Sequence, residues 1–266
     1  MSGAPQPRTL EAHGRLWGAQ ARDWADFMEG TCRPVFEAAL DRTGVGPGTR
    51  YLDVGCGTGM AADMAAARGA DVSGLDAAEG MLSIARERVA NGDFRRGDLE
   101  DLPFADDTFD VVTGFNAFQY AGNPVAALRE ASRVAKRDGR VVVATFGNPD
   151  GMGAATLITA LAPLLPPRPP GTPGPFALSD ENALRSFAAN AGLEPIDVFD
   201  VDSPWMYPDE ATALRGLNSS GVATRAMENS SEAAVSDAHR QALTPFRLAD
   251  GSFCIGASFR CLLARP

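Results

Sequence analysis

A glycine-rich run carries the strongest chemical signal in this sequence. It reads LDVGCGTG from Leu52 to Gly59, after a short apolar stretch that predicts a strand and before an alanine-rich stretch that predicts a helix. Glycine lets the backbone turn sharply and approach a ligand without a Cβ in the way. The following helix aims free N–H groups at whatever lies over its N-terminus. This context favours a binding site over the alternative, an ordinary glycine-rich turn.

Carboxylates end the next two predicted strands. Asp76 ends the second strand, where it can accept hydrogen bonds from both ribose hydroxyls of an adenosine; helix N-capping is the alternative. Asp98 ends the third strand and can accept from an adenine amino group, or it can serve only as a turn residue. Met81 and Leu99 can sandwich the flat base, although a core position explains Met81 nearly as well.

The glycine spacing bears on the kind of nucleotide. A dinucleotide fingerprint needs Gly-x-Gly-x-x-Gly. Here Gly55, Gly57 and Gly59 alternate, and Met60 stands where the third glycine of that fingerprint belongs. The spacing therefore disfavours a pyrophosphate site and with it a nicotinamide-dependent oxidoreductase.

The elements around these residues alternate between strand and helix. Short apolar runs predict strands, and stretches with one apolar face predict helices between them. Strands that are apolar throughout indicate a parallel sheet covered by helices on both faces, and the right-handed crossover rule makes it doubly wound. The predicted strands are 51–54, 71–75, 93–96, 109–115 and 140–146, and the predicted helices are 60–68, 79–90 and 124–135.

The flanking segments are less regular. Small and polar residues predict disorder up to about residue 9, and the Gly- and Pro-rich segment 147–175 predicts a mobile loop with one short helix. Ser179 is a candidate N-cap for a helix that ends near Ala191. The other expected elements are helices at 10–30 and 34–42, a strand at 194–201, about two helices near 209–217 and 231–243, and one alternating strand at 251–263.

Several of these motifs resemble one known family. The run from Leu52 to Gly59 resembles motif I of class I S-adenosylmethionine-dependent methyltransferases, and Asp76 matches the family's ribose-binding acid. Residues 97–104, which read GDLEDLPF, resemble its adenine-binding segment. FDVV at 109–112, followed by Asn116, resembles its fourth strand and the loop beyond. The resemblance covers about residues 50–146 and is greatest to the small-molecule group that includes ubiquinone and menaquinone methyltransferases.

The resemblance implies a fold and a division of the chain. The fold is a Rossmann-like, doubly wound, mostly parallel sheet of seven strands whose last strand is antiparallel, with 194–201 and 251–263 as its final two strands. An N-terminal helical cap is expected at 1–49. The S-adenosylmethionine-binding domain is expected at 50–266, with lid insertions at 147–178 and 203–250.

The resemblance also implies roles for the residues at the predicted crevice. The cofactor is S-adenosylmethionine, and each role follows from a motif position. The three glycines approach its methionine and ribose, Asp53 lies near the methionine amino group, Asp76 holds the ribose, Met81 packs on the adenine, Asp98 and Leu99 bind the base, and Asn116 lies where cofactor and acceptor meet.

The reaction leaves no motif by which to find a catalytic base. Methyl transfer is an in-line displacement in which the cofactor supplies the electrophile, and alignment alone contributes ~7–11 kcal/mol. Gln119 and Tyr120 follow the fourth strand and are candidates. His239, in the second insertion, is another because the unperturbed pKa of histidine is near 6.5; a solvated helix position beside Arg240 is the alternative. His13 is discounted in the same way.

Aromatic residues outside the matched region suggest an apolar acceptor pocket. The candidates are Trp17 and Trp24 in the N-terminal region, Tyr120 after the fourth strand, and Trp205 and Tyr207 in the second insertion. Plain core packing is the alternative for the two N-terminal tryptophans. An apolar lid predicts a small, fairly hydrophobic metabolite methylated at O, N or C.

Composition excludes several classes of partner. The formal net charge is −10 with no basic run, and residues 114–120, GFNAFQY, lack the Asp/Asn-Pro-Pro-aromatic motif of DNA amino-methylating enzymes, so we expect no nucleic acid. The chain has four cysteines and two histidines without metal-site spacing, so we expect no metal. It has no signal-like start and no apolar run of about 18 residues, so we expect a cytoplasmic protein without a membrane segment. The sequence does not indicate an oligomeric state.

Two alternatives to methyl transfer remain open at this level. A protein with the same motif I can instead use the charge of the bound sulfonium for other chemistry, such as a cyclisation. A non-catalytic module that only binds the cofactor also has the same motifs.

Overall fold

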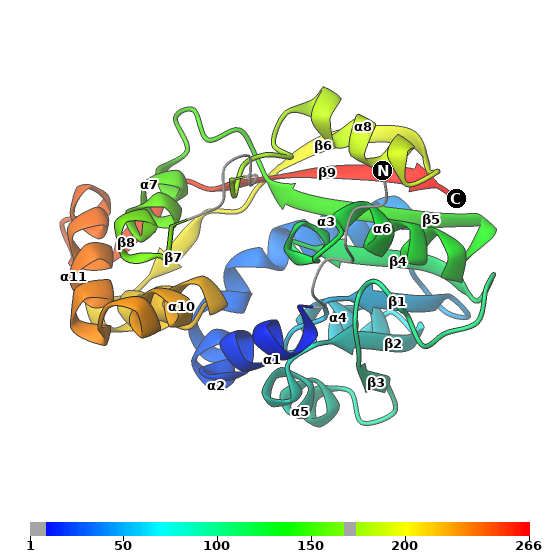
Figure 1. The fold of residues 1–266 in the computed structure, drawn as a ribbon, viewed down its shortest axis with the longest axis horizontal. Helices are drawn as coiled ribbons and strands as arrows, with labels where there is room; N and C mark the ends of the chain where they lie inside the picture. The colour runs from blue at the N-terminus through cyan, green and yellow to red at the C-terminus, as the bar shows by residue number, and fades with distance from the viewer. Residues whose placement is uncertain (1–8, 168–173) are drawn as a thin grey trace.

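The computed structural model describes residues 9–167 and 174–266, and its main feature is a mixed sheet (Figure 1). Within these residues the sheet has seven strands in the order β3-β2-β1-β4-β5-β9-β6, and β9 runs antiparallel to both of its neighbours. This confirms the predicted doubly wound sheet with an antiparallel last strand. The strands are β1 (Arg50–Val54), β2 (Asp71–Asp76), β3 (Asp93–Arg96), β4 (Phe109–Phe115), β5 (Ala135–Phe146), β6 (Glu194–Asp202) and β9 (Ser258–Arg265).

Helices cover both faces of the sheet, as the apolar strands predict. Adjacent residues of β1 point to opposite faces. Tyr51 packs in a cluster with α3 (Arg33–Thr43), α4 (Met60–Ala67) and α5 (Glu79–Arg88). Leu52 packs in the opposite cluster, with α6 (Pro124–Val134) and α8 (Glu181–Asn190). The strand order reverses between β1 and β4, so their carboxyl ends flank the crevice where ligands bind in such sheets.

The N-terminal region is not the single helix expected at 10–30. It is divided into α1 (Leu10–Gly18), α2 (Ala21–Asp23), the π-helical turn η1 (Trp24–Met28) and the 3-10 turn η2 (Glu29–Cys32). Gln20 leaves the helical region with φ −131° and ψ 39°. The pieces pack against different partners: α1 contacts α5 and α10 (Gly221–Asn229), and η1 contacts α9 (Glu210–Asn218). These tertiary contacts divide the segment, although its apolar residues could form one face of a continuous helix.

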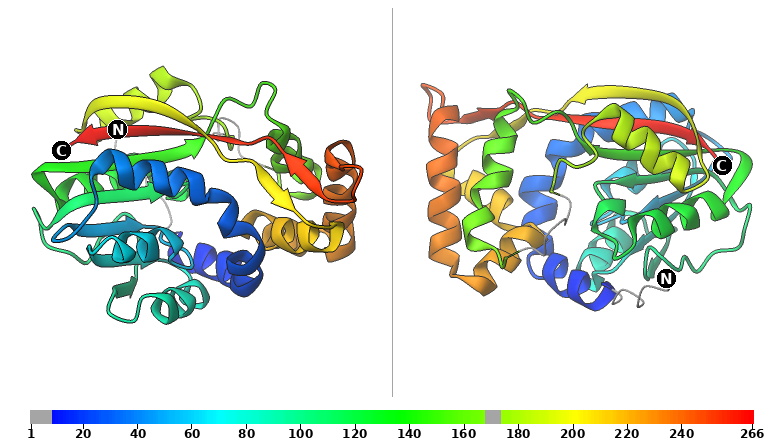
Figure 2. Two further views of the ribbon diagram at one scale, coloured as in Figure 1. Left: turned by 180° about the vertical axis from the view of Figure 1, so that it is seen from behind. Right: turned by 45° about the horizontal axis from the view of Figure 1, so that its top comes forward.

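A second layer of structure, the lid, lies at one end of the molecule (Figures 1 and 2). It contains α7 (Gly153–Ala160), α9, α10, α11 (Glu232–Leu243) and a ribbon in which β7 (Trp205–Tyr207) pairs with β8 (Phe253–Ile255). Residues 203–250 are all described and contain three α-helices, so the expectation of about two helices was wrong and α10 was missed. Short 3-10 turns complete the lid, η4 (Ala162–Leu164) and η5 (Thr244–Phe246).

The final strand expected at 251–263 is also divided. Gly256 and Ala257 interrupt it, and their carbonyls accept hydrogen bonds from Ala154 N and Ser203 N instead of a strand partner. β8 therefore belongs to the lid and β9 to the main sheet. Burial still alternates through the break, so a period-2 pattern could not reveal it.

One smaller correction concerns the cap of α8. The N-cap of α8 is Asp180, whose side chain accepts from Ala183 N at 2.9 Å, and not Ser179. The disorder expected before residue 9 falls on residues that the structure does not describe, as does part of the proline tract at 166–170. No helix in the described ranges is long and apolar enough to cross a bilayer.

Candidate functional site

The glycine-rich turn joins β1 to α4 at the crevice. Its glycines have positive φ, 74° at Gly55, 54° at Gly57 and 83° at Gly59, a region that only glycine occupies freely. A Cβ at Gly55 would lie 2.6 Å from Ala117 Cβ, and one at Gly59 would lie 2.8 Å from Ala85 Cβ. At Gly57 the nearest neighbour would be 3.9 Å away. Gly55 and Gly59 therefore allow close packing, whereas Gly57 presents bare backbone to an open space.

Asp76 ties this turn to the end of β2. Its Oδ2 accepts from Gly57 N at 2.9 Å and its Oδ1 from Ala78 N at 2.8 Å. The N-cap of α5 is Ala78 and makes no side-chain cap, so Asp76 does not have the N-capping role considered from the sequence. Burial raises the pKa of the Asp76 carboxyl. Each oxygen has a further lone pair, which leaves capacity for hydroxyl donors.

Asp53 lies near the end of β1, and its side chain is buried at the base of the crevice. It is 2% exposed, and Thr113 Oγ1 donates to its Oδ1 at 2.8 Å. Burial raises the pKa of Asp53 to about 7, and the nearby carboxylates Glu29 and Asp76 contribute. A cation placed beside Asp53 would restore its ionised form.

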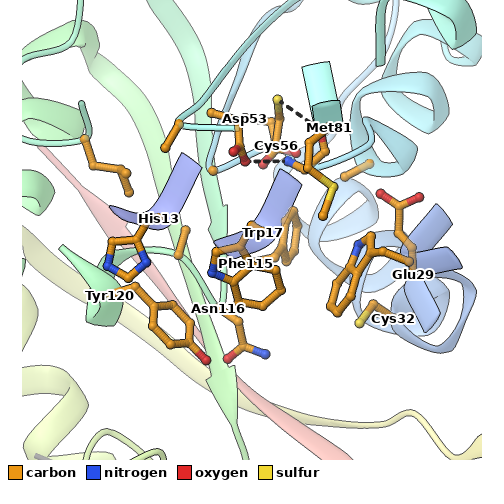
Figure 3. A pocket seen from close by; sticks show the side chains of 18 of the residues that line it. His13, Trp17, Glu29, Cys32, Asp53, Cys56, Met81, Phe115, Asn116 and Tyr120 are labelled. Atoms are coloured by element: carbon orange, nitrogen blue, oxygen red, sulfur yellow. Dashed lines mark hydrogen bonds between the residues drawn. The ribbon is translucent and has the colours of Figure 1, made fainter. Parts of the chain in front are cut away.

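These groups open into one cavity that runs along the strand ends, from β3 to β9 (Figure 3). Figure 3 shows His13, Trp17, Asn116 and Tyr120 around the same space as Asp53 and Met81. Polar groups line the cavity near β2 and β3, and apolar side chains line it near β4 and β9. The apolar set is Cys32, Val35, Phe36, Ala61, Phe115 and Phe259.

At the β3 end of the cavity, one buried carboxylate oxygen has no hydrogen-bond donor. Asp98 is 8% exposed, its Oδ1 accepts from Glu100 N, and its Oδ2 is buried without a hydrogen-bond partner. A buried acceptor of this kind needs a donor, and a ligand amino group supplies one. Leu99 and the 1% exposed Met81 line the same end, so a flat base fits the residues present.

The loop after β4 brings Asn116 and Tyr120 to the cavity. Asn116 has φ 49°, and Gln119 Nε2 donates to its Oδ1 at 3.0 Å. Gln119 does not line the cavity, so it orients the Asn116 amide and does not face a ligand. The Tyr120 ring lies 5.9 Å from Trp17, which in turn meets Trp24 edge-on at 5.2 Å.

Three of the predicted site residues lie in the lid, away from the cavity. His239 is 3% exposed inside the lid, where Nδ1 bonds Asn218 Oδ1 at 2.7 Å and burial lowers its pKa to about 4. It is neither a base at the cavity nor the solvated residue of the alternative interpretation. Trp205 and Tyr207 are buried in the lid core because β7 faces inward there, and Tyr207 Oη donates to Met28 Sδ. Trp17 and Trp24, by contrast, line the cavity.

A buried ion pair at the cavity was not found from the sequence. Glu29, 4% exposed, pairs with Arg88 of α5, and its Oε1 accepts from Met60 N at 3.3 Å. Arg88 Nη1 also donates to Thr58 O at 3.0 Å. The pair fastens the N-terminal region to the glycine turn. Glu29 lies in a stretch predicted as a helix, and nothing in the local pattern distinguishes it from a solvated residue.

The fold and the site together define a class. A sheet of this order, with a glycine turn after β1 and an acid ending β2, is the Rossmann-like fold of class I methyltransferases. Residues 52–143 match the family described as Methyltransferase domain. The segment 52–143 is therefore similar in sequence to methyltransferase domains, and the sheet around it has their Rossmann-like fold.

The curated relatives are methyltransferases by name. The chain is 43% identical over 110 residues to demethylmenaquinone methyltransferase of Renibacterium salmoninarum (41% of this chain, 46% of the relative). It is 37% identical over 142 residues to malonyl-acyl-carrier-protein O-methyltransferase of Erwinia pyrifoliae (53% and 54%). It is 34% identical over 155 residues to ubiquinone biosynthesis O-methyltransferase of Ruegeria pomeroyi (56% and 62%). The chain thus spans about half the length of the curated relatives it matches.

Solved structures share the fold over more of the chain. The cyclase SpnF superposes with a TM-score of 0.63 at 20% identity, covering 99% of this chain and 98% of that one. A putative methyltransferase from Bacillus halodurans gives 0.56 at 17% identity (86% and 97%). Geranyl diphosphate methyltransferase, solved with its substrate and sinefungin, gives 0.51 at 20% identity (87% and 76%). At these identities the likeness establishes the fold alone.

Proposed function

We propose that this protein is an S-adenosylmethionine-dependent methyltransferase that acts on a small, fairly apolar acceptor at O, N or C. The observation that carries the proposal is the Asp76 carboxylate, which is hydrogen-bonded to Gly57 N and lines the same cavity as Asp53 and the unpartnered Oδ2 of Asp98. These groups match, in order, a ribose, an ammonium group and an adenine amino group.

In this proposal the residues of the chain bind S-adenosylmethionine and orient it toward the acceptor. S-adenosylmethionine, when bound, supplies the electrophilic methyl group. Asp76 holds the ribose diol, Asp98 and Leu99 hold the base, and Asp53 lies beside the methionine amino group. Gly57 allows the backbone close to the ligand. Trp17 and Trp24 cover the cavity from the N-terminal side and exclude water, so that alignment of donor and acceptor provides most of the rate.

The lining of the cavity supports an uncharged acceptor. Its β4 and β9 end is apolar, and among the lining residues, all within the described ranges, there is no Lys or Arg to pair with an anion. The names of two relatives, demethylmenaquinone methyltransferase and ubiquinone biosynthesis O-methyltransferase, fit an acceptor with an apolar part. The acidic net charge supports a small molecule in place of a nucleic acid, and the scattered cysteines support a cytoplasmic location.

Two measurements test the proposal. Calorimetry should show binding of S-adenosylmethionine and S-adenosylhomocysteine, and Asp76→Asn should weaken both by about tenfold or more, since a charged hydrogen bond to the ribose is lost. The control Asp138→Asn, at an exposed carboxylate far from the cavity, should bind normally. Incubation with S-adenosylmethionine and a panel of phenols, amines and quinols should yield a product that has gained one methyl group.

The outcomes separate the proposal from its alternatives. Binding together with a converted acceptor that gains no methyl group would favour sulfonium-assisted chemistry such as cyclisation. Binding without conversion of any acceptor would favour a cofactor-binding module. No binding, with Asp76→Asn indistinguishable from the unsubstituted protein, would end the proposal.

A further inference from the structure

Helix α1 covers the part of the cavity where β2 and β3 end. It presents residues at positions 10, 13 and 17, one face of a helix, and all three line the cavity. The helix is held close to the strand ends, because a Cβ at Gly14 would lie 2.5 Å from Ala77 O. Arg96 donates to both Ala77 O and the Glu11 carboxylate and so ties α1 to β3. The face of α1 is thus fixed over the same end of the cavity as Asp98.

His13 has an unused acceptor at this end. Its Nδ1 is buried and has no hydrogen-bond partner, although the ring bonds the backbone of Tyr120. With the proton of the neutral ring on Nε2, Nδ1 has a lone pair that can accept a hydrogen bond. Burial lowers the pKa of His13, with Arg225 acting in the same direction and Asp98 opposing both, so the neutral form prevails at pH 7.

Asp98 and His13 therefore present two acceptors without donors. Asp98 Oδ2 is buried and unpartnered, as His13 Nδ1 is, and the two side chains lie close enough to interact electrostatically. Two lone pairs from different elements, facing one cavity, fit a ligand group with two hydrogens on one nitrogen. A ring nitrogen or a carbonyl oxygen of a base would meet lone pairs instead and be repelled.

We propose that His13 is a base-recognition residue: its Nδ1 accepts one hydrogen of the adenine amino group while Asp98 Oδ2 accepts the other. This inference rests on the proposed function, since it assigns the adenine of S-adenosylmethionine to this end of the cavity. The proposal gives α1 a specific role, because this helix then contributes a hydrogen bond to the base in addition to covering the cavity. Phe115 ends β4 and Phe259 lies on β9, strands that β2 and β1 separate from β3 in the sheet, so the inference assigns His13 to the base and not to the acceptor.

The test compares two ligands and four forms of the full chain. S-adenosylhomocysteine carries the amino group, and S-inosylhomocysteine carries a carbonyl oxygen in its place. Calorimetry on the unsubstituted protein should show at least tenfold weaker binding of the inosyl ligand. His13→Phe should weaken S-adenosylhomocysteine by about tenfold, the loss of one buried hydrogen bond, and change the inosyl ligand by less than about twofold. His13→Asn, which keeps an amide oxygen near the Nδ1 position, should recover part of the loss and also serves if His13→Phe does not fold.

Other outcomes overturn the inference in distinguishable ways. Ala12→Gln, an exposed change on the same helix, should leave both affinities unchanged. If His13→Phe weakens both ligands equally, His13 only packs and the inference is wrong. If His13→Phe leaves binding intact and lowers turnover of a methylated acceptor, His13 acts on the acceptor and the inference is again wrong. If the unsubstituted protein binds neither ligand, the proposed function fails and this inference fails with it.

Discussion

Glu29 and Arg88 form a buried ion pair across the mouth of the glycine turn. Glu29 comes from the N-terminal 3-10 turn and Arg88 from the end of α5, and both also bond the backbone of the turn, at Met60 N and Thr58 O. A pair of this kind links three segments that are far apart in the sequence. The shape of the cofactor crevice therefore depends on the N-terminal region as well as on the sheet.

The first prediction concerns this pair. Glu29→Gln leaves Arg88 largely buried without a counter-charge, so the free energy of unfolding should fall by about 3 kcal/mol, and the affinity for S-adenosylmethionine should fall as the turn loosens. Urea unfolding and calorimetry measure the two effects. Glu37→Gln is the control, because Glu37 pairs with Arg33 at 3.9 Å on the surface and should cost less than about 1 kcal/mol. Equal losses in the two variants would contradict the assigned role of Glu29.

A second prediction concerns the exposed backbone at Gly57. Alanine there must adopt φ 54° and places a methyl group in the cavity, so Gly57→Ala should destabilise the fold by about 1–2 kcal/mol and weaken S-adenosylmethionine by at least about tenfold. Gly48→Ala is the matched control, since Gly48 has φ 81° with nothing within 4 Å of a Cβ. It should show similar destabilisation with unchanged affinity. Loss of affinity in both variants would show that strain alone, and not the cavity, explains the effect.

The third prediction is a pH dependence that comes from Asp53. Burial raises its pKa to about 7, so near neutral pH the carboxyl is about half protonated, and a bound ammonium group favours the ionised form. Binding should then release protons, and affinity should increase from about pH 6 to pH 8, by at most tenfold per pH unit. Calorimetry in two buffers of different ionisation enthalpy measures the proton count. Asp53→Asn should abolish the dependence; an unchanged pH profile in that variant would assign it to another group.

The fourth prediction is a stability effect in the lid. Burial lowers the pKa of His239 from 6.5 to about 4. Between these two pH values His239 is therefore protonated in the unfolded chain and neutral in the folded chain. The contribution of neutral His239 is complete above about pH 6.5 and is lost as the pH falls towards 4, up to about 3 kcal/mol. His239→Gln should flatten the fall in unfolding free energy over this interval. Parallel profiles for the two proteins, measured by urea unfolding, would show that His239 does not titrate as described.

The central sheet could be predicted because local pattern and tertiary structure agree there. Strands such as β4 are buried on both faces and read as continuous apolar runs, and the glycine turn lies between a predicted strand and a predicted helix. Asp76 ends β2, and Asp98 lies two residues after the end of β3, where the alternation of elements places them. Their side chains therefore follow from the positions of the strands.

The lid and the N-terminal region could not be predicted in the same way. The period of burial continues through the break at Gly256, so the sequence does not distinguish one long strand from two short ones. Glu29 and His239 have polar side chains on helical stretches, a pattern that usually indicates solvent exposure. Their burial depends on partners, Arg88 and Asn218, that only the tertiary fold brings near.

The break between β8 and β9 has a further consequence. The chain leaves the main sheet after β6 at Ser203 and returns at Ala257, and these two residues are joined by a hydrogen bond of 2.9 Å from Ser203 N to Ala257 O. The segment 204–256 is thus connected to the main sheet at two residues that are hydrogen-bonded to each other. Because β6 ends at Asp202 and β9 begins at Ser258, every pairing of the main sheet lies outside this segment, and a change of length within it leaves the register of the sheet intact.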